Sequence, residues 1–183
     1  MYNSKNIDDL RPDVAANCRI FLALCHRAGL HPLVTGTVRD EAFQLDAYEK
    51  GYSKSKRPAF HAQGIGLAFD FCRNLPGHEY DDLDFFEHCG VIGEAIGFEW
   101  GGRWRSFPDR PHLQWSGPRR DYTSSDIWAG RLPPPMPAYH PASQPPDAPP
   151  PAPPLPEAEG MNPTAPMTRE GFAVILDRAG CLK

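Results

Sequence analysis

The sequence of 183 residues lacks the patterns that mark several classes of protein. Its five cysteines are odd in number and form no CxxC pair, so neither a disulfide framework nor a cysteine zinc site is expected. The formal net charge is −4 and there is no run of Lys or Arg, which argues against nucleic acid as a partner. No apolar stretch reaches the roughly 18 residues that a membrane span requires. The polar, acidic residues 1–13 are unlike a secretory signal, so we expect synthesis in the cytoplasm.

Proline, by contrast, is concentrated in one part of the chain. Residues 131–166 hold 15 of the 22 prolines, a composition typical of an extended linker that packs no core. We therefore predict a globular domain over residues 1–130 and a proline-rich linker over 131–166. Residues 167–183 have the pattern of an amphipathic helix too short to be stable alone. This segment would have to dock on its own domain, on another copy or on a partner, and the sequence leaves these alternatives open.

Helical and strand patterns alternate within the predicted globular domain. The spacing of apolar residues and the positions of aspartate, proline and glycine predict helices over 12–28, 40–51 and 81–97. Short strands are predicted over 32–37, 66–72 and 112–115. Because the strands are few and short, we predict an α+β fold in which helices flank a small, largely antiparallel sheet. A monomer is expected, although nothing in the sequence tests this.

The stretch FHAQGIGLAFDF, residues 60–71, places an acidic residue inside an apolar strand. Strand alternation puts Asp70 on the face opposite Phe69 and Phe71. A buried carboxylate is costly unless it is paired with a cation or bound to a metal. Asp70 on its own is therefore explained by a salt bridge to an arginine, by a cap on a backbone turn or by a metal site.

Two histidines and a second aspartate could complete a metal site with Asp70. His61 begins the same stretch, and His112 follows Pro111, which restrains the local backbone. Two histidines and one aspartate suit zinc with a fourth position left open to water. Asp109, three residues before His112, could take a proton from that water. Each residue alone is unremarkable, but together they predict a metallohydrolase.

This stretch and the later EWGGRWRSFPDRPHLQW together resemble the zinc D,D-carboxypeptidase and L-alanyl-D-glutamate endopeptidase family. That family includes VanY-like enzymes and phage endolysins, and it shares its fold with the hedgehog signalling domain. Its pattern is S-x-H-x-x-G-x-A-x-D followed by acid-x-x-His, and the resemblance covers roughly residues 5–116. The resemblance implies a Zn²⁺ cofactor and the stem peptide of bacterial peptidoglycan as substrate. It further implies cleavage of the L-Ala–D-Glu bond by an endolysin that reaches the wall after release from the cytoplasm.

The same resemblance implies a role for each of five residues. His61, Asp70 and His112 correspond to the zinc ligands of the family. Asp109 corresponds to its catalytic acid and base, and Arg39 to the arginine that holds a substrate oxygen and offsets charge.

The spacing before Asp70 leaves two alignments open. Eight residues separate His61 from Asp70, whereas the family pattern has six. Strict alignment from Asp70 puts Gln63, a poor zinc ligand, in the first position. A two-residue insertion in the flexible Gly-Ile-Gly segment would return His61 to the metal, and we favour this alignment. The alternatives to the endopeptidase are a D-alanyl-D-alanine carboxypeptidase and a non-catalytic wall-binding descendant that has lost its metal.

Overall fold

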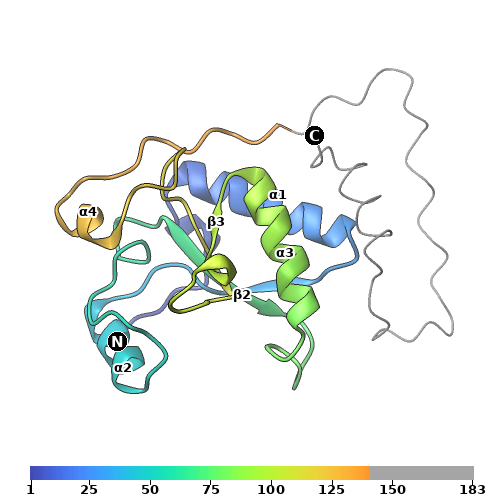
Figure 1. The fold of residues 1–183 in the computed structure, drawn as a ribbon, viewed down its shortest axis with the longest axis horizontal. Coiled ribbons are helices and arrows are strands. Elements are labelled where there is room, and N and C mark those ends of the chain that lie inside the picture. The colour runs from blue at the N-terminus through green and yellow to red at the C-terminus, as the bar shows by residue number, and fades with distance from the viewer. Residues whose placement is uncertain (141–183) are drawn as a thin grey trace, which may run out of the picture. The chain divides into compact units, whose positions relative to one another are not determined.

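The computed structural model describes residues 1–140. The predicted helical segment 167–183 and most of the predicted linker lie outside the described residues, so the division of the chain remains a prediction. No helix within residues 1–140 is long and apolar enough to cross a membrane. The elements in chain order (Figure 1) are η1 (Ile7–Asp9), α1 (Pro12–Arg27), β1 (Pro32–Gly36), α2 (Glu41–Glu49), β2 (Ala68–Arg73), α3 (Leu83–Ile96), β3 (Glu99–Trp100), η2 (Gly101–Arg103), β4 (His112–Gln114) and α4 (Ser124–Trp128).

The four strands form one antiparallel sheet in the order β1-β2-β4-β3. Strand β2 is therefore interior, with β1 on one side and β4 on the other. In this register Asp70 pairs with Gly36 of β1 and with His112 of β4. The α+β fold with a small antiparallel sheet that the sequence predicts is confirmed.

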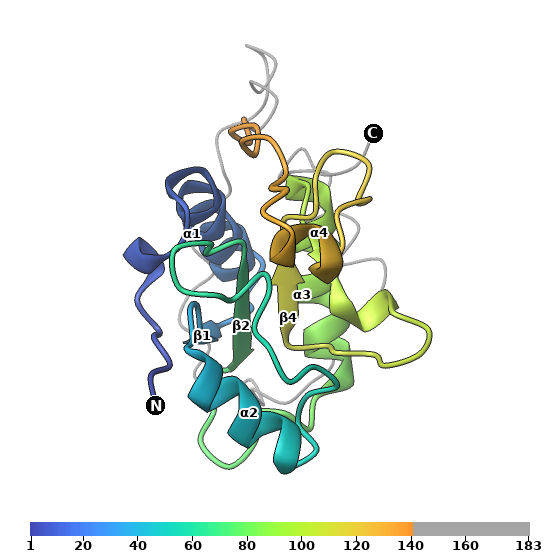
Figure 2. The ribbon, with the colours of Figure 1, turned by 90° about the vertical axis from the view of Figure 1, so that its left-hand side faces the viewer.

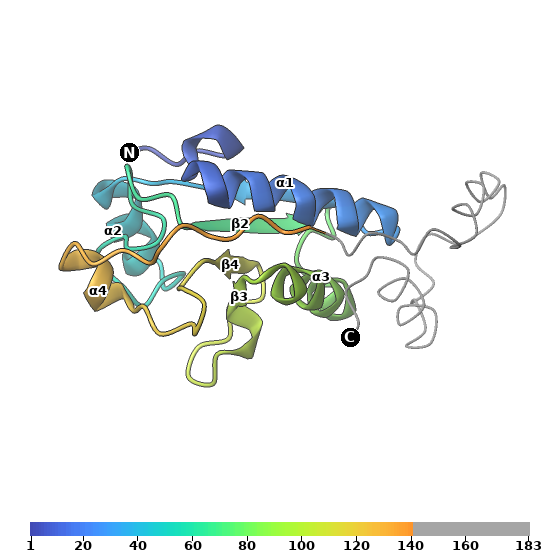
Figure 3. The same ribbon diagram turned by 90° about the horizontal axis from the view of Figure 1, so that it is seen from above.

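Helices α1 and α3 cover one face of this sheet and form the apolar core with it (Figures 1 and 3). Phe21 of α1 packs on Phe69 and Phe71 of β2, with ring centroids 5.5 and 5.4 Å apart. All three rings are fully buried. Because side chains alternate along a strand, Asp70 emerges on the opposite face, where His112 lies beside it. The core face thus supplies packing while the other face carries the polar groups.

Helices α2 and α3 begin after capping aspartates, close to the starts that the sequence predicts. The side chains of Asp40 and Asp82 each accept a hydrogen bond from the backbone N–H three residues later, at 2.7 and 2.9 Å. Helix α3 ends at Gly97, whose φ of 118° favours glycine. The sequence analysis missed α4, which begins with a reciprocal capping box between Thr123 and Asp126. Helix α2 lies apart from α1 and α3, near the end of the sheet where β1 finishes and β2 begins (Figures 1 and 2).

The first part of the proline-rich segment packs along α1, between this helix and α3 (Figure 3). The Asn17 side chain donates to the carbonyl oxygen of Pro137 and accepts from the N–H of Tyr139, both at 2.9 Å. Met136 is only 3% exposed. The Asn17 side chain thus forms the same pair of hydrogen bonds with the backbone of residues 137–139 that a neighbouring strand would form. The buried side chain of Met136 adds this segment to the apolar core.

We expect Asn17→Ala to lower the free energy of unfolding by about 1–3 kcal/mol, because it leaves buried backbone groups without partners. Urea unfolding of the full chain measures this loss. The exposed Asn74 has no such contacts in the described structure, so Asn74→Ala should change stability by less than about 0.5 kcal/mol. Equal stability of the two variants would contradict the role given to Asn17.

Candidate active site

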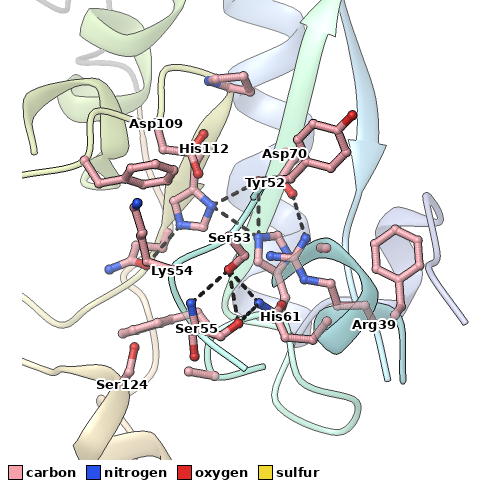
Figure 4. A pocket seen from close by; sticks show the side chains of 18 of the residues that line it. Arg39, Tyr52, Ser53, Lys54, Ser55, His61, Asp70, Asp109, His112 and Ser124 are labelled. Carbon is pink, nitrogen blue, oxygen red and sulfur yellow. Dashed lines mark hydrogen bonds and ion pairs between the residues drawn. The ribbon is translucent and has the colours of Figure 1, made fainter. Parts of the chain in front are cut away.

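Three polar side chains converge on the open face of the sheet (Figure 4). The register of β2 and β4 places Asp70 beside His112. His61 comes from the turn that precedes β2, where its carbonyl oxygen accepts a hydrogen bond of 2.8 Å from the N–H of Arg39. Neighbouring strands and one backbone contact therefore bring together the three residues that the sequence singles out as ligands.

The ligand atoms of these residues form a nearly equilateral triangle. Asp70 Oδ1 lies 3.0 Å from His112 Nδ1 and 3.2 Å from His61 Nε2. The two imidazole nitrogens are also 3.2 Å apart. Tetrahedral zinc with bonds of about 2.0–2.1 Å separates its ligand atoms by about 3.3 Å. The spacing therefore fits a metal ion of this size.

Hydrogen bonds on the outer side of each ring fix the direction of its lone pair. His61 Nδ1–H donates to the carbonyl oxygen of Thr37 at 2.7 Å, and His112 Nε2–H donates to Gln114 Oε1 at 3.0 Å. The Gln114 amide is itself fixed, because its N–H donates to Glu99 at 2.8 Å. A neutral imidazole carries one proton, so both inner nitrogens are left as acceptors. These two acceptors and a carboxylate oxygen face one point, and a bound cation would stabilise that arrangement.

Burial and charge act differently on the three groups of this triangle. Burial opposes the charged form of His112, but the hydrogen bond and the charge of Asp70 raise the pKa of this ring, so a metal must displace a proton there. Burial lowers the pKa of His61, which keeps the ring neutral. Burial opposes ionisation of Asp70, but the charge of His61 and hydrogen bonds from His112 and His61, when their inner nitrogens are protonated, hold the pKa of this carboxyl well below its usual range. A bound metal ion would take the place of those protons. Arg39 adds an ion pair, since its Nη1 lies 3.4 Å from Asp70 Oδ2. Asp70 therefore has both the arginine partner and the ligand geometry that the sequence left as alternatives.

Asp109 lies beside His112 at the edge of the triangle (Figure 4). Its backbone is tied to Gly101, whose carbonyl oxygen accepts from the Asp109 N–H at 2.9 Å. A Cβ on Gly101 would lie 2.5 Å from the Asp109 carbonyl oxygen, so only glycine allows this approach. Burial raises the pKa of the Asp109 carboxyl, and the charge of Asp70 adds to this effect. A carboxyl of this kind is suited to proton transfer.

Arg39 lies on the other side of the triangle, next to Asp70 (Figure 4). Its Nε–H is buried and has no hydrogen-bond partner among residues 1–140. A buried donor without a partner is costly, and a bound ligand oxygen would satisfy it. The side chain can therefore offer a charged donor to a ligand.

All five of these residues line one cavity of about 790 Å³ (Figure 4). One further wall is the loop that follows α2, which the sequence analysis did not assign to the site; it contributes Tyr52, Ser53, Lys54, Ser55 and Arg57. Gln44 of α2 is 2% exposed and fixes that loop, because its Nε2 donates to Ser53 Oγ and to the Ser55 carbonyl oxygen, both at 2.7 Å. No local pattern signals this contact. Trp104 forms another wall, with its ring centroid 5.1 Å from that of His112.

The structure does not bring Gln63 to the triangle. Gln63 is exposed and lines a second hollow instead. Gly64 and Gly66 have φ of 76° and 56°, and the carbonyl oxygen of Gly66 accepts from the N–H of Arg11 at 2.9 Å. The left-handed turn at Gly64 and Gly66 accommodates the two residues by which the segment between His61 and Asp70 exceeds the family pattern. It is His61 that lies beside Asp70, as in the alignment with an insertion.

Comparisons with known proteins agree with this geometry. Residues 53–115 match a family model described as D-alanyl-D-alanine carboxypeptidase. The chain is 29% identical over 123 residues to the peptidoglycan L-alanyl-D-glutamate endopeptidase CwlK of Bacillus subtilis (strain 168), covering 58% of this chain and 73% of that protein. It is 30% identical over 115 residues to the L-alanyl-D-glutamate peptidase of Listeria phage A118, covering 61% of this chain and 40% of the phage protein.

The fold also resembles that of a solved structure, the Serratia marcescens L-Ala D-Glu endopeptidase ChiX. The TM-score is 0.52 at 24% identity, covering 66% of this chain and 92% of that one. The chain therefore shares the fold of that structure, and its sheet carries a His-Asp-His group that could hold a metal. Residues 53–115 match that peptidase family, and the two relatives are named as L-alanyl-D-glutamate peptidases, so the resemblance drawn from the sequence is confirmed.

Replacing each candidate for the first ligand tests the alignment directly. His61→Ala should remove most of the bound metal, because it deletes one of three donors, whereas Gln63→Ala should retain it. Metal content per protein, measured by mass spectrometry after dialysis against trace zinc, distinguishes the two. Metal loss in the Gln63 variant alone would refute the assignment of His61.

Proposed function

We propose that this protein is a zinc-dependent peptidase that hydrolyses the L-Ala–D-Glu bond in the stem peptide of bacterial peptidoglycan, in the manner of a phage endolysin. The observation that carries this proposal is the convergence of three ligand atoms beside the half-buried carboxyl group of Asp109 in one cavity. The names of the two relatives support the choice of bond, and the phage origin of one supports the endolysin role.

The donor set supports zinc as the cofactor. Two imidazole nitrogens and one carboxylate oxygen, from His61, His112 and Asp70, are a ligand set that catalytic zinc accepts with one position left open. When bound, zinc polarises a carbonyl group and makes water more acidic. The outer hydrogen bonds to Thr37 and Gln114 would hold the two rings in the orientation that binding requires.

The residues beside the metal ligands would move the proton and balance charge. In this proposal Asp109 takes a proton from the attacking water and returns it to the leaving amine. Its raised pKa supports this role, because a carboxylate that is more basic accepts a proton more readily. Arg39 donates to the carbonyl oxygen of the scissile bond as negative charge develops there, and its unpartnered Nε–H supports that role.

A second candidate is a D-alanyl-D-alanine carboxypeptidase, which the description of the matching family model favours. This enzyme would remove one terminal alanine and leave the wall network intact. Mass spectrometry of purified peptidoglycan, digested with and without a chelator, separates the candidates. A new D-Glu amino terminus that disappears with chelator supports the endopeptidase, and loss of one alanine supports the carboxypeptidase. No cleavage of walls from several bacterial types would favour a non-catalytic wall-binding protein.

Replacing Asp109 separates proton transfer from metal binding. Asp109→Ala should keep its zinc and lose at least about 100-fold in kcat, because the variant lacks a general base. Steady-state cleavage of a soluble stem peptide, with zinc content measured on the same sample, tests both parts. Turnover near that of the unaltered protein would mean that the base is another group.

The acidic limb of the pH profile should reflect Asp109. The carboxylate acts as a base only when it is deprotonated, so kcat/KM should fall as the pH falls through its pKa. Because burial raises that pKa, the fall should begin at a higher pH than for an exposed carboxyl group. Zinc content measured across the same pH range controls for metal release by protonated ligands. A profile that stays flat down to the ordinary carboxyl range while zinc remains bound would contradict this role.

A further inference from the structure

A second hollow of about 430 Å³ lies next to the cavity of the metal ligands. Arg39 and Arg57 line both, so these two side chains border the catalytic cavity and the second hollow. The backbone of Arg39 also bridges to Ala62, one residue beyond His61, which ties the wall between the two spaces to a metal ligand. A ligand that fills the cavity could therefore extend into the hollow.

An indole ring held in a defined orientation forms one side of this hollow. Trp128 of α4 is 40% exposed, and its Nε1–H donates to the carbonyl oxygen of Pro58 at 2.9 Å. The guanidinium carbon of Arg57 lies 5.4 Å from the centroid of the ring. Trp128 lies beyond residues 53–115, so the match to the family model does not account for it.

The remaining walls combine apolar and polar groups. Ile65 and Ile127 contribute apolar surface, and Ile127 is nearly fully buried. Gln63 is exposed, and its side-chain amide makes no hydrogen bond within residues 1–140. Glu41 is exposed at the start of α2. The Glu41 carboxylate lies 4.0 Å from Arg57 Nε and keeps acceptor capacity toward solvent. An aromatic ring beside amide and carboxylate groups is the chemistry that binds a sugar, whose apolar ring face stacks while its hydroxyl and acetamido groups form hydrogen bonds.

We propose that this hollow binds the N-acetylated sugar to which the stem peptide is attached. The inference rests on the proposed function. The sugar is joined through a lactyl group to the amino group of L-Ala, so it lies one residue from the L-Ala–D-Glu bond. It is much farther from a terminal D-Ala–D-Ala bond. A sugar subsite bordering the catalytic cavity therefore fits cleavage at the first bond and gives Trp128 a role in substrate specificity.

The test compares two soluble substrates, a stem peptide that carries the disaccharide on L-Ala and the same peptide without sugar. The full chain should cleave the sugar-bearing peptide with a kcat/KM about tenfold higher, a difference in the range of one aromatic contact. Trp128→Ala should remove most of this preference, and Trp128→Phe should keep part of it because a ring remains. Leu83→Ala, at an exposed site on α3, is the control and should leave the ratio unaltered.

The ratio of kcat/KM for the sugar-bearing and sugar-free peptides tests the sugar subsite independently of the peptidase activity. Equal rates on both substrates, or a preference that Trp128→Ala leaves intact, would overturn the subsite while the peptidase activity stands. If neither substrate is cleaved, the proposed function fails, and binding of the free disaccharide, followed by NMR, tests the hollow alone. Binding that is lost in Trp128→Ala would support the sugar site, and no binding to the full chain would overturn it.

Discussion

The site depends on one electrostatic constraint, which is that three hydrogen-bond acceptors face a single point. His61 Nε2, His112 Nδ1 and Asp70 Oδ1 lie within 3.2 Å of one another, and when both rings are neutral their protons are held by acceptors on the outer side. Without a metal ion or a proton between them these three atoms repel one another, and burial strengthens the repulsion. The surrounding strands and hydrogen bonds must therefore stabilise these three atoms at distances where they would otherwise repel one another.

Two paired strands and the aromatic core beneath them hold two of the three ligand residues in place. The antiparallel pairing of β2 with β4 fixes the separation of Asp70 and His112, and the aromatic core beneath β2 keeps that strand in place. His61 is the exception, because it comes from a turn. It is restrained by two backbone contacts, one from its ring to Thr37 and one from its carbonyl oxygen to Arg39. The loop that completes the cavity is held to α2 by the buried amide of Gln44 and by backbone hydrogen bonds from Tyr52 and Ser53 to the carbonyl oxygen of Ala47.

Local sequence patterns predicted the parts that depend on local chemistry. Strand alternation placed Asp70 on the face opposite Phe69, and capping residues placed the starts of the helices. Residue types alone suggested the ligand set, but assigning roles to its members required the resemblance to a known family, because His61 and His112 are 51 residues apart. Asn17 could not be predicted to hold the proline-rich segment, since its partners lie about 120 residues away.

X-ray absorption spectroscopy of the zinc-loaded full chain would show which residues bind the metal. We expect a first coordination shell of two imidazole nitrogens and carboxylate or water oxygens at about 2.0–2.1 Å, and His112→Ala should reduce the imidazole count to one. A shell that contains sulfur, or one with fewer than two imidazoles in the unaltered protein, would contradict the assignment of His61, Asp70 and His112 as the metal site.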